Sequence, residues 1–196
     1  MSKESLQDQR NMDPGKASED QDGYAAAFGA ESFKALLAQV ESGEKLNGRQ
    51  KVFHSRTKLR DIALLSILFE TGISAAECVG LNVDDVDFSR NCLNLLRITG
   101  LESFLYFGDE TAQRLRDYIK QRSELLLGDQ DPEALFISLQ RRRISVRAVE
   151  ILVKKHAGMF TGRTDITPQR LAKARKSSFP PENDAICCIA QLSSRE

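Results

Sequence analysis

The residues of this chain best suited to chemistry are lysines and arginines gathered in one segment. Between residues 141 and 176 the sequence places eleven of them against only two acidic residues, a local charge of +9. The whole chain has 28 basic and 28 acidic residues, so acidic stretches elsewhere balance this segment. Such a concentration of positive charge indicates a polyanionic partner, although a solvated basic helix face without any partner gives the same pattern.

Cysteine and histidine, the other side chains with catalytic or metal-binding potential, lack the spacing of a site. The four cysteines follow no CxxC pattern, and the two histidines are far apart in the sequence. We therefore expect no metal and no other cofactor. Cys78 and Cys92 are expected to be small core residues. Cys187 and Cys188 are adjacent, which argues against a simple disulfide framework and favours free thiols in a reducing cytoplasm.

Composition and length indicate one globular domain. The chain has 196 residues, of which 41% are hydrophobic and 29% charged, and these are ordinary values for a soluble protein. No apolar run approaches the roughly 20 residues that a membrane span needs, so no membrane association is expected. The beginning of the sequence is polar and acidic, which is unlike a secretory signal.

Periodic apolar residues predict the helices that position the first half of the chain. The first helix has an apolar stripe at positions i, i+3, i+4 and i+7, made of Phe33, Leu36, Leu37 and Val40. A second helix over residues 55–70 is apolar on most sides and is therefore expected to be central. Ser74 and Glu77 then fit a capping box that opens a short helix ending near Gly80.

The basic segment is expected to lie on helices that follow a small sheet. Strands are predicted over residues 92–98 and 104–107, joined by a turn at 99–102, with a third short strand at 135–137. Three helix starts follow from capping residues at Asp109, Ser145 and Thr167, the last with Pro168 at the first helical position. His156 is expected near a helix C-terminus, where it would complement the helix dipole.

These elements predict a mainly α domain with a small antiparallel β-sheet, an α+β fold. Residues 1–28 are too polar to form a core and are expected to be a flexible arm, and residues 29–176 form the domain. Residues 177–196 depart from the pattern as a divergent tail. Its apolar stretch at 185–190 either covers part of the core or belongs to a read-through or frameshifted end.

Six short motifs follow one another along roughly residues 29–175, with the hairpin between the second and the third. They are Arg60–Leu65 with Thr71-Gly72-Ile73, Glu77–Phe88, Gly108-Asp109-Glu110, Leu135–Ser138, Ser145–Ala157 and Ile166-Thr167-Pro168. Their order is that of the tyrosine recombinase, or phage integrase, family, and the shared order argues against chance. The chain therefore resembles the catalytic domain of that family, which implies a mainly helical fold that handles DNA.

The resemblance also shows which catalytic residues are missing. In that family a tyrosine attacks a DNA phosphodiester, two arginines stabilise the phosphoryl oxygens, and a lysine and a histidine handle protons. Here Ser74 stands in place of the first arginine, Gln169 in place of the histidine and Ala172 in place of the second arginine. Residues 99–103 contain no lysine, and no tyrosine follows the basic segment. We therefore expect a catalytically inactive relative.

Three functions remain open at this point. The first is binding to duplex DNA through its phosphate backbone, without sequence preference. The second is a protein-interaction module that oligomerises with itself or binds and inhibits an active recombinase. The third is a folded remnant without function. The residues predicted to contact DNA are Arg141, Arg142, Arg143, Arg147, Lys154, Lys155, Arg170 and Lys173.

Overall fold

Helix α3 (Gly48–Thr71) forms the centre of the molecule, and the other helices pack around it. The computed structural model describes residues 29–96, 102–125, 131–163 and 165–178. All nine residues from 61 to 69 are buried, as the apolar composition of this stretch predicts. The predicted arm (1–28) and nearly all of the predicted tail (177–196) lie outside the described residues.

The first two turns of α3 extend beyond the prediction, which started this helix at Ser55. The structure begins it at Gly48, after an N-cap at Asn47. The Asn47 side chain accepts a hydrogen bond from the Gln50 amide at 2.9 Å, and the Gln50 side chain accepts one from the Asn47 amide at 3.0 Å. These turns are largely exposed, so the apolar periodicity used for the prediction could not detect them.

Helix α2 (Ala30–Ser42) packs against α3 through the predicted apolar stripe. All four residues of the stripe are buried, and the ring of Phe33 stacks on that of Phe69 with 3.9 Å between centroids. The helix ends at Gly43, which adopts a left-handed conformation with φ of 64°. A glycine is favoured there because a side chain would strain this backbone conformation.

Helix α4 (Ala75–Gly80) is short and leads into the sheet through the 3₁₀ helix η1 (Val83–Asp85). The sheet has the antiparallel order β1 (Val86–Asp87), β2 (Cys92–Leu96) and β3 (Glu102–Tyr106). In its register Leu93 faces Leu105. Both strands of the predicted hairpin are present, but the second begins at Glu102, two residues earlier than predicted, and residues 97–101 lie outside the described residues.

The third strand predicted at Leu135–Ile137 is wrong. Ala134 and Ile137 form only isolated bridges, and the third strand of the sheet is β1 instead. The reason is that the backbone groups of this segment bond in several directions. The Leu135 amide donates to the Leu81 carbonyl at 2.9 Å, and the Ile137 amide donates to the Tyr118 hydroxyl at 3.0 Å.

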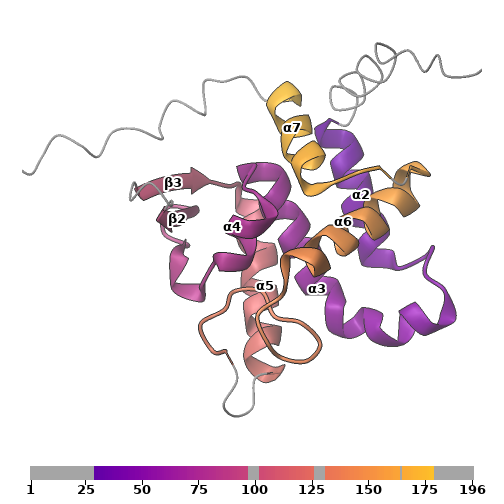
Figure 1. The fold of residues 1–196 in the computed structure, drawn as a ribbon, viewed down its shortest axis with the longest axis horizontal. Helices are drawn as coiled ribbons and strands as arrows, with labels where there is room; N and C mark the ends of the chain where they lie inside the picture. The colour runs from indigo at the N-terminus through magenta and orange to yellow at the C-terminus, as the bar shows by residue number, and fades with distance from the viewer. Residues whose placement is uncertain (1–28, 97–101, 126–130, 164, 179–196) are drawn as a thin grey trace, which may run out of the picture.

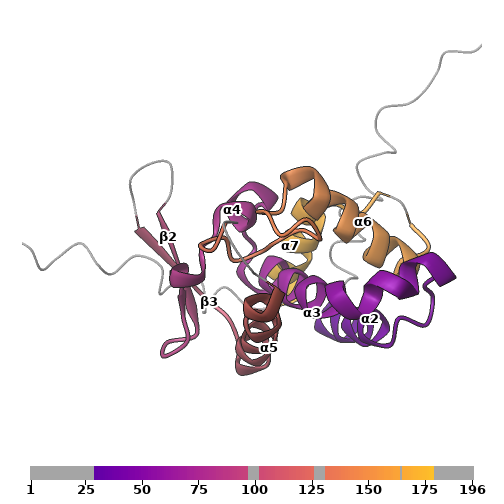
Figure 2. The same ribbon diagram turned by 90° about the horizontal axis from the view of Figure 1, so that it is seen from below.

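Three further helices complete the fold: α5 (Asp109–Leu125), α6 (Val146–Thr161) and α7 (Pro168–Ser178). Helices α5 and α7 pack on α3, and α6 contacts α2 and α4. Figure 1 shows α3 running through the middle of this group, and Figure 2 shows the sheet at one end of the molecule and α2 at the other. The α+β class expected from the sequence is confirmed.

The burial of α3 makes its stability contribution testable with a matched pair of substitutions. Leu68→Ala removes a side chain with no exposed surface and should lower the free energy of unfolding by about 2–5 kcal/mol. Val52→Ala, on the same helix but 70% exposed, should change it by less than about 0.5 kcal/mol. Urea unfolding followed by circular dichroism measures both. Equal losses would mean that the two ends of α3 are equally packed.

Candidate nucleic-acid interface

Ser74, which the resemblance sets in place of the family's first arginine, is a helix cap. Ser74 precedes α4, and its Oγ accepts a hydrogen bond from the Glu77 amide at 3.2 Å. Glu77 Oε2 accepts one from the Ser74 amide at 2.8 Å, which confirms the predicted capping box. The serine side chain is therefore engaged with the backbone of its own helix and has no charge to offer a phosphate.

Gln169 and Ala172, which the resemblance sets in place of the family's histidine and second arginine, lie on α7, which begins as predicted. Thr167 Oγ1 accepts a hydrogen bond from the Arg170 amide at 3.3 Å, and Pro168 follows at the first helical position. Gln169 is exposed and Ala172 is half-buried, whereas Leu171 between them is 1% exposed and belongs to the core. The helix is thus anchored like a core helix, but neither substituted position carries a charge.

The arginine nearest to these positions is held by an acidic residue. Arg170 Nη1 donates to the Asp165 carbonyl at 2.9 Å and also pairs with the Asp165 carboxylate. Arg163 forms two hydrogen bonds of 3.0 Å with the same carboxylate. The hydrogen bonds from Arg163, followed by those from Arg170, hold the pKa of Asp165 far below its usual range. Arg170 is consequently less available to a phosphate than its sequence suggests.

Helix α6 has a mainly apolar inner face and an outer face on which cations lie beside the exposed Glu150 and Ile151. Ser145 caps it by accepting a hydrogen bond from the Ala148 amide at 3.2 Å, as predicted. On the outer face Arg147 and Lys154 are exposed, and Lys155 is half-buried. Among the residues that the structure describes, no carboxylate pairs with these three side chains. The buried inner face consists of Val149, Leu152, Val153, His156 and Ala157.

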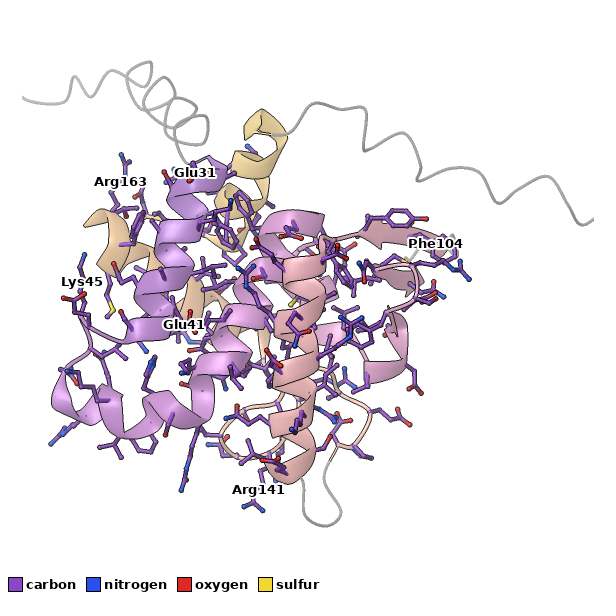
Figure 3. The ribbon with its side chains drawn as sticks, turned by 180° about the vertical axis from the view of Figure 1, so that it is seen from behind. Glu31, Glu41, Lys45, Phe104, Arg141 and Arg163 are labelled. Carbon is purple, nitrogen blue, oxygen red and sulfur yellow. The ribbon has the colours of Figure 1, made fainter. Side chains whose placement is uncertain are left out.

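The arginine triplet divides into two exposed residues and one structural residue. Arg141 and Arg142 are exposed in a tight turn, in which the Ser138 amide donates to the Arg142 carbonyl at 2.7 Å. Arg141 has a φ of 62°, and Figure 3 shows its side chain pointing away from the body of the molecule.

Arg143 turns inward instead. Its Nε pairs with the Asp131 carboxylate at 3.0 Å, and its Nη2 donates to the Asn82 side chain at 2.7 Å. Its Nη1 lies 3.0–3.1 Å from the carbonyls of residues 79–81, where α4 ends. All three nitrogens of the guanidinium therefore serve the fold, a role that the run of three identical residues did not reveal.

A buried charged cluster is the main feature that the sequence interpretation missed. Asp61 is 4% exposed and His156 is 2% exposed, and His156 Nε2 donates to Asp61 Oδ2 at 3.0 Å. Arg60 donates to Asp61 Oδ1 from Nε at 3.0 Å and from Nη2 at 2.7 Å. The prediction that His156 complements a helix dipole is wrong, because its ring points into the core rather than towards the end of α6.

Burial by itself would raise the pKa of Asp61, but its two partners reverse this effect. The hydrogen bond from His156 and the positive charge of Arg60 together hold the pKa of the carboxyl below its usual value. Asp61 is therefore ionised at neutral pH although it is buried. An apolar run in the sequence contains no sign of this cluster, because only the fold brings His156 of α6 within hydrogen-bonding distance of Asp61 on α3.

The remaining candidates for chemistry are unremarkable in the described parts of the chain. Cys78 and Cys92 are buried free thiols, as predicted, and burial raises the pKa of both. No group of three acidic, cysteine or histidine side chains in the described ranges could hold a metal ion. No helix within those ranges is both long and apolar enough to cross a membrane. Lys173 is exposed on α7.

Comparison with known proteins identifies relatives for most of the chain. Residues 33–175 match the Phage integrase family. The chain is 33% identical over 136 residues to tyrosine recombinase XerC of Corynebacterium glutamicum, covering 69% of this chain and 42% of the relative. It is 34% identical over 116 residues to tyrosine recombinase XerD of Neisseria meningitidis serogroup B, covering 59% of this chain and 40% of that relative. The chain thus spans about two fifths of the length of these relatives.

Solved structures show the same fold. The crystal structure of XerA recombinase superposes with a TM-score of 0.58 at 22% identity, covering 73% of this chain and 46% of the other. XerH site-specific recombinase bound to its difH substrate gives a TM-score of 0.58 at 12% identity, covering 75% and 40%.

The two kinds of arginine in the triplet should respond differently to substitution. Arg143→Ala should lower the free energy of unfolding by about 2 kcal/mol, because Asp131 and the carbonyls at the end of α4 lose a charged donor. Arg142→Ala removes an exposed side chain and should change it by less than about 0.5 kcal/mol. Chemical denaturation of both variants tests this difference, and equal effects would contradict the assignment of Arg143 to the fold.

Acid should destabilise the protein through Asp61. Its carboxyl has a lower pKa in the folded than in the unfolded state, so the unfolded state binds more protons in acid. This stabilisation is complete at pH values above the pKa of the carboxyl in the unfolded state, about 4, and it is lost as the pH falls through the pKa in the folded state. The free energy of unfolding, obtained from denaturation curves between pH 7 and pH 2, should therefore decrease less steeply for Asp61→Asn than for the original chain. Parallel pH profiles would show that Asp61 is not responsible.

Proposed function

Because this chain belongs to the phage integrase family, we propose that it binds duplex DNA through the phosphate backbone and does not cleave it. It is a tyrosine-recombinase-like protein related to DNA recombination. The observation that carries the proposal is the contrast between two surfaces. On the outer face of α6, Arg147 and Lys154 pair with no carboxylate of the described residues, whereas the positions that the resemblance assigns to both phosphate-stabilising arginines hold neutral side chains.

The absence of cleavage is supported by what the substituted positions do instead. Ser74 completes a helix cap, and Ala172 is half-buried on α7. Loss of one such charge-stabilising donor commonly costs roughly 3–4 kcal/mol of transition-state stabilisation, and two are lost here. Arg170 does not restore them, because it is bound to Asp165 and points in another direction around the helix.

The tyrosine of the domain core is also unsuited to attack a phosphate. Tyr118 is 1% exposed, and its hydroxyl accepts the hydrogen bond from the Ile137 amide at 3.0 Å. Burial raises its pKa to about 12, so its hydroxyl is less readily deprotonated than that of a free tyrosine. Tyr106 is exposed, but it lies on β3 in the sheet at the end of the molecule.

Backbone binding is supported by the exposed cations near the start and along the outside of α6. Arg141 and Arg142 precede the helix, and Arg147 and Lys154 lie on it. Flexible cations that pair with no described carboxylate can neutralise phosphates without removing an existing ion pair. The XerH site-specific recombinase, which shares the fold, was solved bound to its difH substrate, and this likeness supports a partner of the same class for this chain.

Salt-dependent DNA binding tests the first half of the proposal. Anisotropy of a labelled random duplex of about 30 base pairs should show binding at low salt that weakens steeply towards physiological salt. Replacing Arg147 and Lys154 by glutamine should reduce the slope of log K against log salt by about 2, since roughly 0.9 is expected per phosphate contact. The matched control replaces Lys51 and Lys120, exposed residues of α3 and α5, by glutamine.

The control should leave the slope nearly unchanged although it removes the same charge. An identical reduction in both double variants would show that only net charge matters. No detectable binding at low salt would overturn the proposal.

Covalent trapping tests the second half. The chain incubated with nicked duplexes should give no protein–DNA adduct that survives denaturing electrophoresis, because the phosphate-stabilising arginines are absent. A stable adduct that disappears on treatment with protease would contradict the proposed lack of cleavage, whatever the affinity for DNA.

A further inference from the structure

The Asp61 carboxylate connects two parts of the molecule that carry exposed cations. Its Oδ2 accepts the hydrogen bond from His156 of α6 at 3.0 Å. Its Oδ1 accepts two hydrogen bonds from Arg60, at 2.7 and 3.0 Å. Arg60 in turn donates from Nη1 to the Ile137 carbonyl at 3.1 Å. One buried anion is therefore linked directly to α6 through His156. Through Arg60 it is also linked to Ile137, the residue before the turn at residues 138–143, called here the arginine turn.

The link through Arg60 ends at the base of that turn. Immediately after Ile137, the Ser138 amide donates to the Arg142 carbonyl, and the Arg141 amide donates to the Ser138 carbonyl at 2.9 Å. The Ile144 amide closes the base by donating to the Phe136 carbonyl at 3.0 Å. The turn has no regular strand to hold it, so its position depends on fixed points such as the Ile137 carbonyl.

The link through His156 acts on α6. His156 is the one polar side chain among the five buried residues described for this helix. Apolar packing is non-directional and tolerates small shifts along or around a helix, whereas a hydrogen bond of 3.0 Å to a fixed carboxylate does not. The other end of α6 has a separate contact, in which Lys45 Nζ donates to the Met159 carbonyl at 3.0 Å.

Loss of either partner of Asp61 costs free energy, because the carboxylate stays buried. The cluster can therefore hold α6 and the turn in fixed positions. Asp61 and His156 are both almost fully buried, and the Arg60 side chain is only 14% exposed. A buried carboxylate that loses a partner retains its desolvation cost without the compensating hydrogen bond. Movement of α6 or of the turn away from Asp61 is therefore opposed more strongly than movement along an apolar surface.

We propose that Asp61 is a positioning residue for DNA binding: its carboxylate fixes helix α6 relative to the turn at residues 138–143. The spacing between the cations of the turn and those of α6 is then set inside the core. This inference rests on the proposed DNA binding for its functional consequence. Its structural part concerns two links that separate variants can break one at a time.

Segment-resolved hydrogen–deuterium exchange tests the two links. Arg60→Met should accelerate amide exchange in residues 138–143 at least threefold and leave α6 nearly unchanged. His156→Leu should accelerate exchange in α6 and leave the turn nearly unchanged, and Asp61→Asn should accelerate both. His156→Gln, whose side-chain amide can donate to the carboxylate, should restore much of the protection in α6.

DNA affinity measured at low salt gives the functional readout. Each single-link variant should bind the random duplex at least fivefold more weakly than the original chain, at temperatures where all are fully folded. Leu68→Ala serves as the control, because it weakens the core of α3 without touching the cluster. It should lose stability but retain its affinity when folded.

The outcomes separate the possible failures. Uniform acceleration of exchange over the whole domain in both single-link variants would overturn the positioning role, as would affinity losses that simply follow stability. If Asp61→Asn does not fold, the two single-link variants still decide the question. If the original chain binds no DNA, the proposed function fails, and the exchange pattern alone decides whether Asp61 holds the two elements.

Discussion

Between residues 61 and 69, helix α3 has no side that faces water, and this complete burial constrains the rest of the structure. A helix that is apolar all round must be covered all round, so α2, α5 and α7 each pack against it. The one ionised group in this stretch, Asp61, needs charged or polar partners that reach into the core. Those partners come from α3 itself and from α6, and they link the core to the basic surface.

Arginine side chains do much of the structural work around this core. The segment from Asp131 to Ile144 contains no regular helix or strand, yet residues 134–137 and Ile144 are buried. Arg122 donates to the carbonyls of Pro132 and Ala134, at 2.6 and 2.8 Å. Arg60 donates to the Ile137 carbonyl in the middle of this segment, and Arg143, near its end, donates to the carbonyls of residues 79–81. Guanidinium groups suit this role because their donors are several, planar and always charged. A count of basic residues in the sequence therefore overstates the charge available to a partner.

The sequence predicts the helices of this fold better than its charged interior. The stripe from Phe33 to Val40, the Ser74 capping box and the Ser145 cap are local patterns, and the structure confirms them. The strand predicted at 135–137 fails because its hydrogen-bonding partners come from distant parts of the chain.

The charged cluster of Asp61 and His156 joins residues far apart in sequence, and no local rule indicates it. The sequence also does not indicate that Arg143 serves the fold while Arg141 and Arg142 are exposed, because several partners of Arg143 are distant in the sequence. The order of the family motifs, in contrast, was sufficient to indicate the family.

The capping box at Ser74 gives this one position two exclusive uses. An arginine there would remove the cap of α4 and leave the Glu77 amide without its hydroxyl partner, at a cost of about 1 kcal/mol. A serine hydroxyl accepts the hydrogen bond that starts the helix, whereas a guanidinium only donates and would supply charge instead. The stability of α4 and positive charge at its start therefore compete for a single side chain.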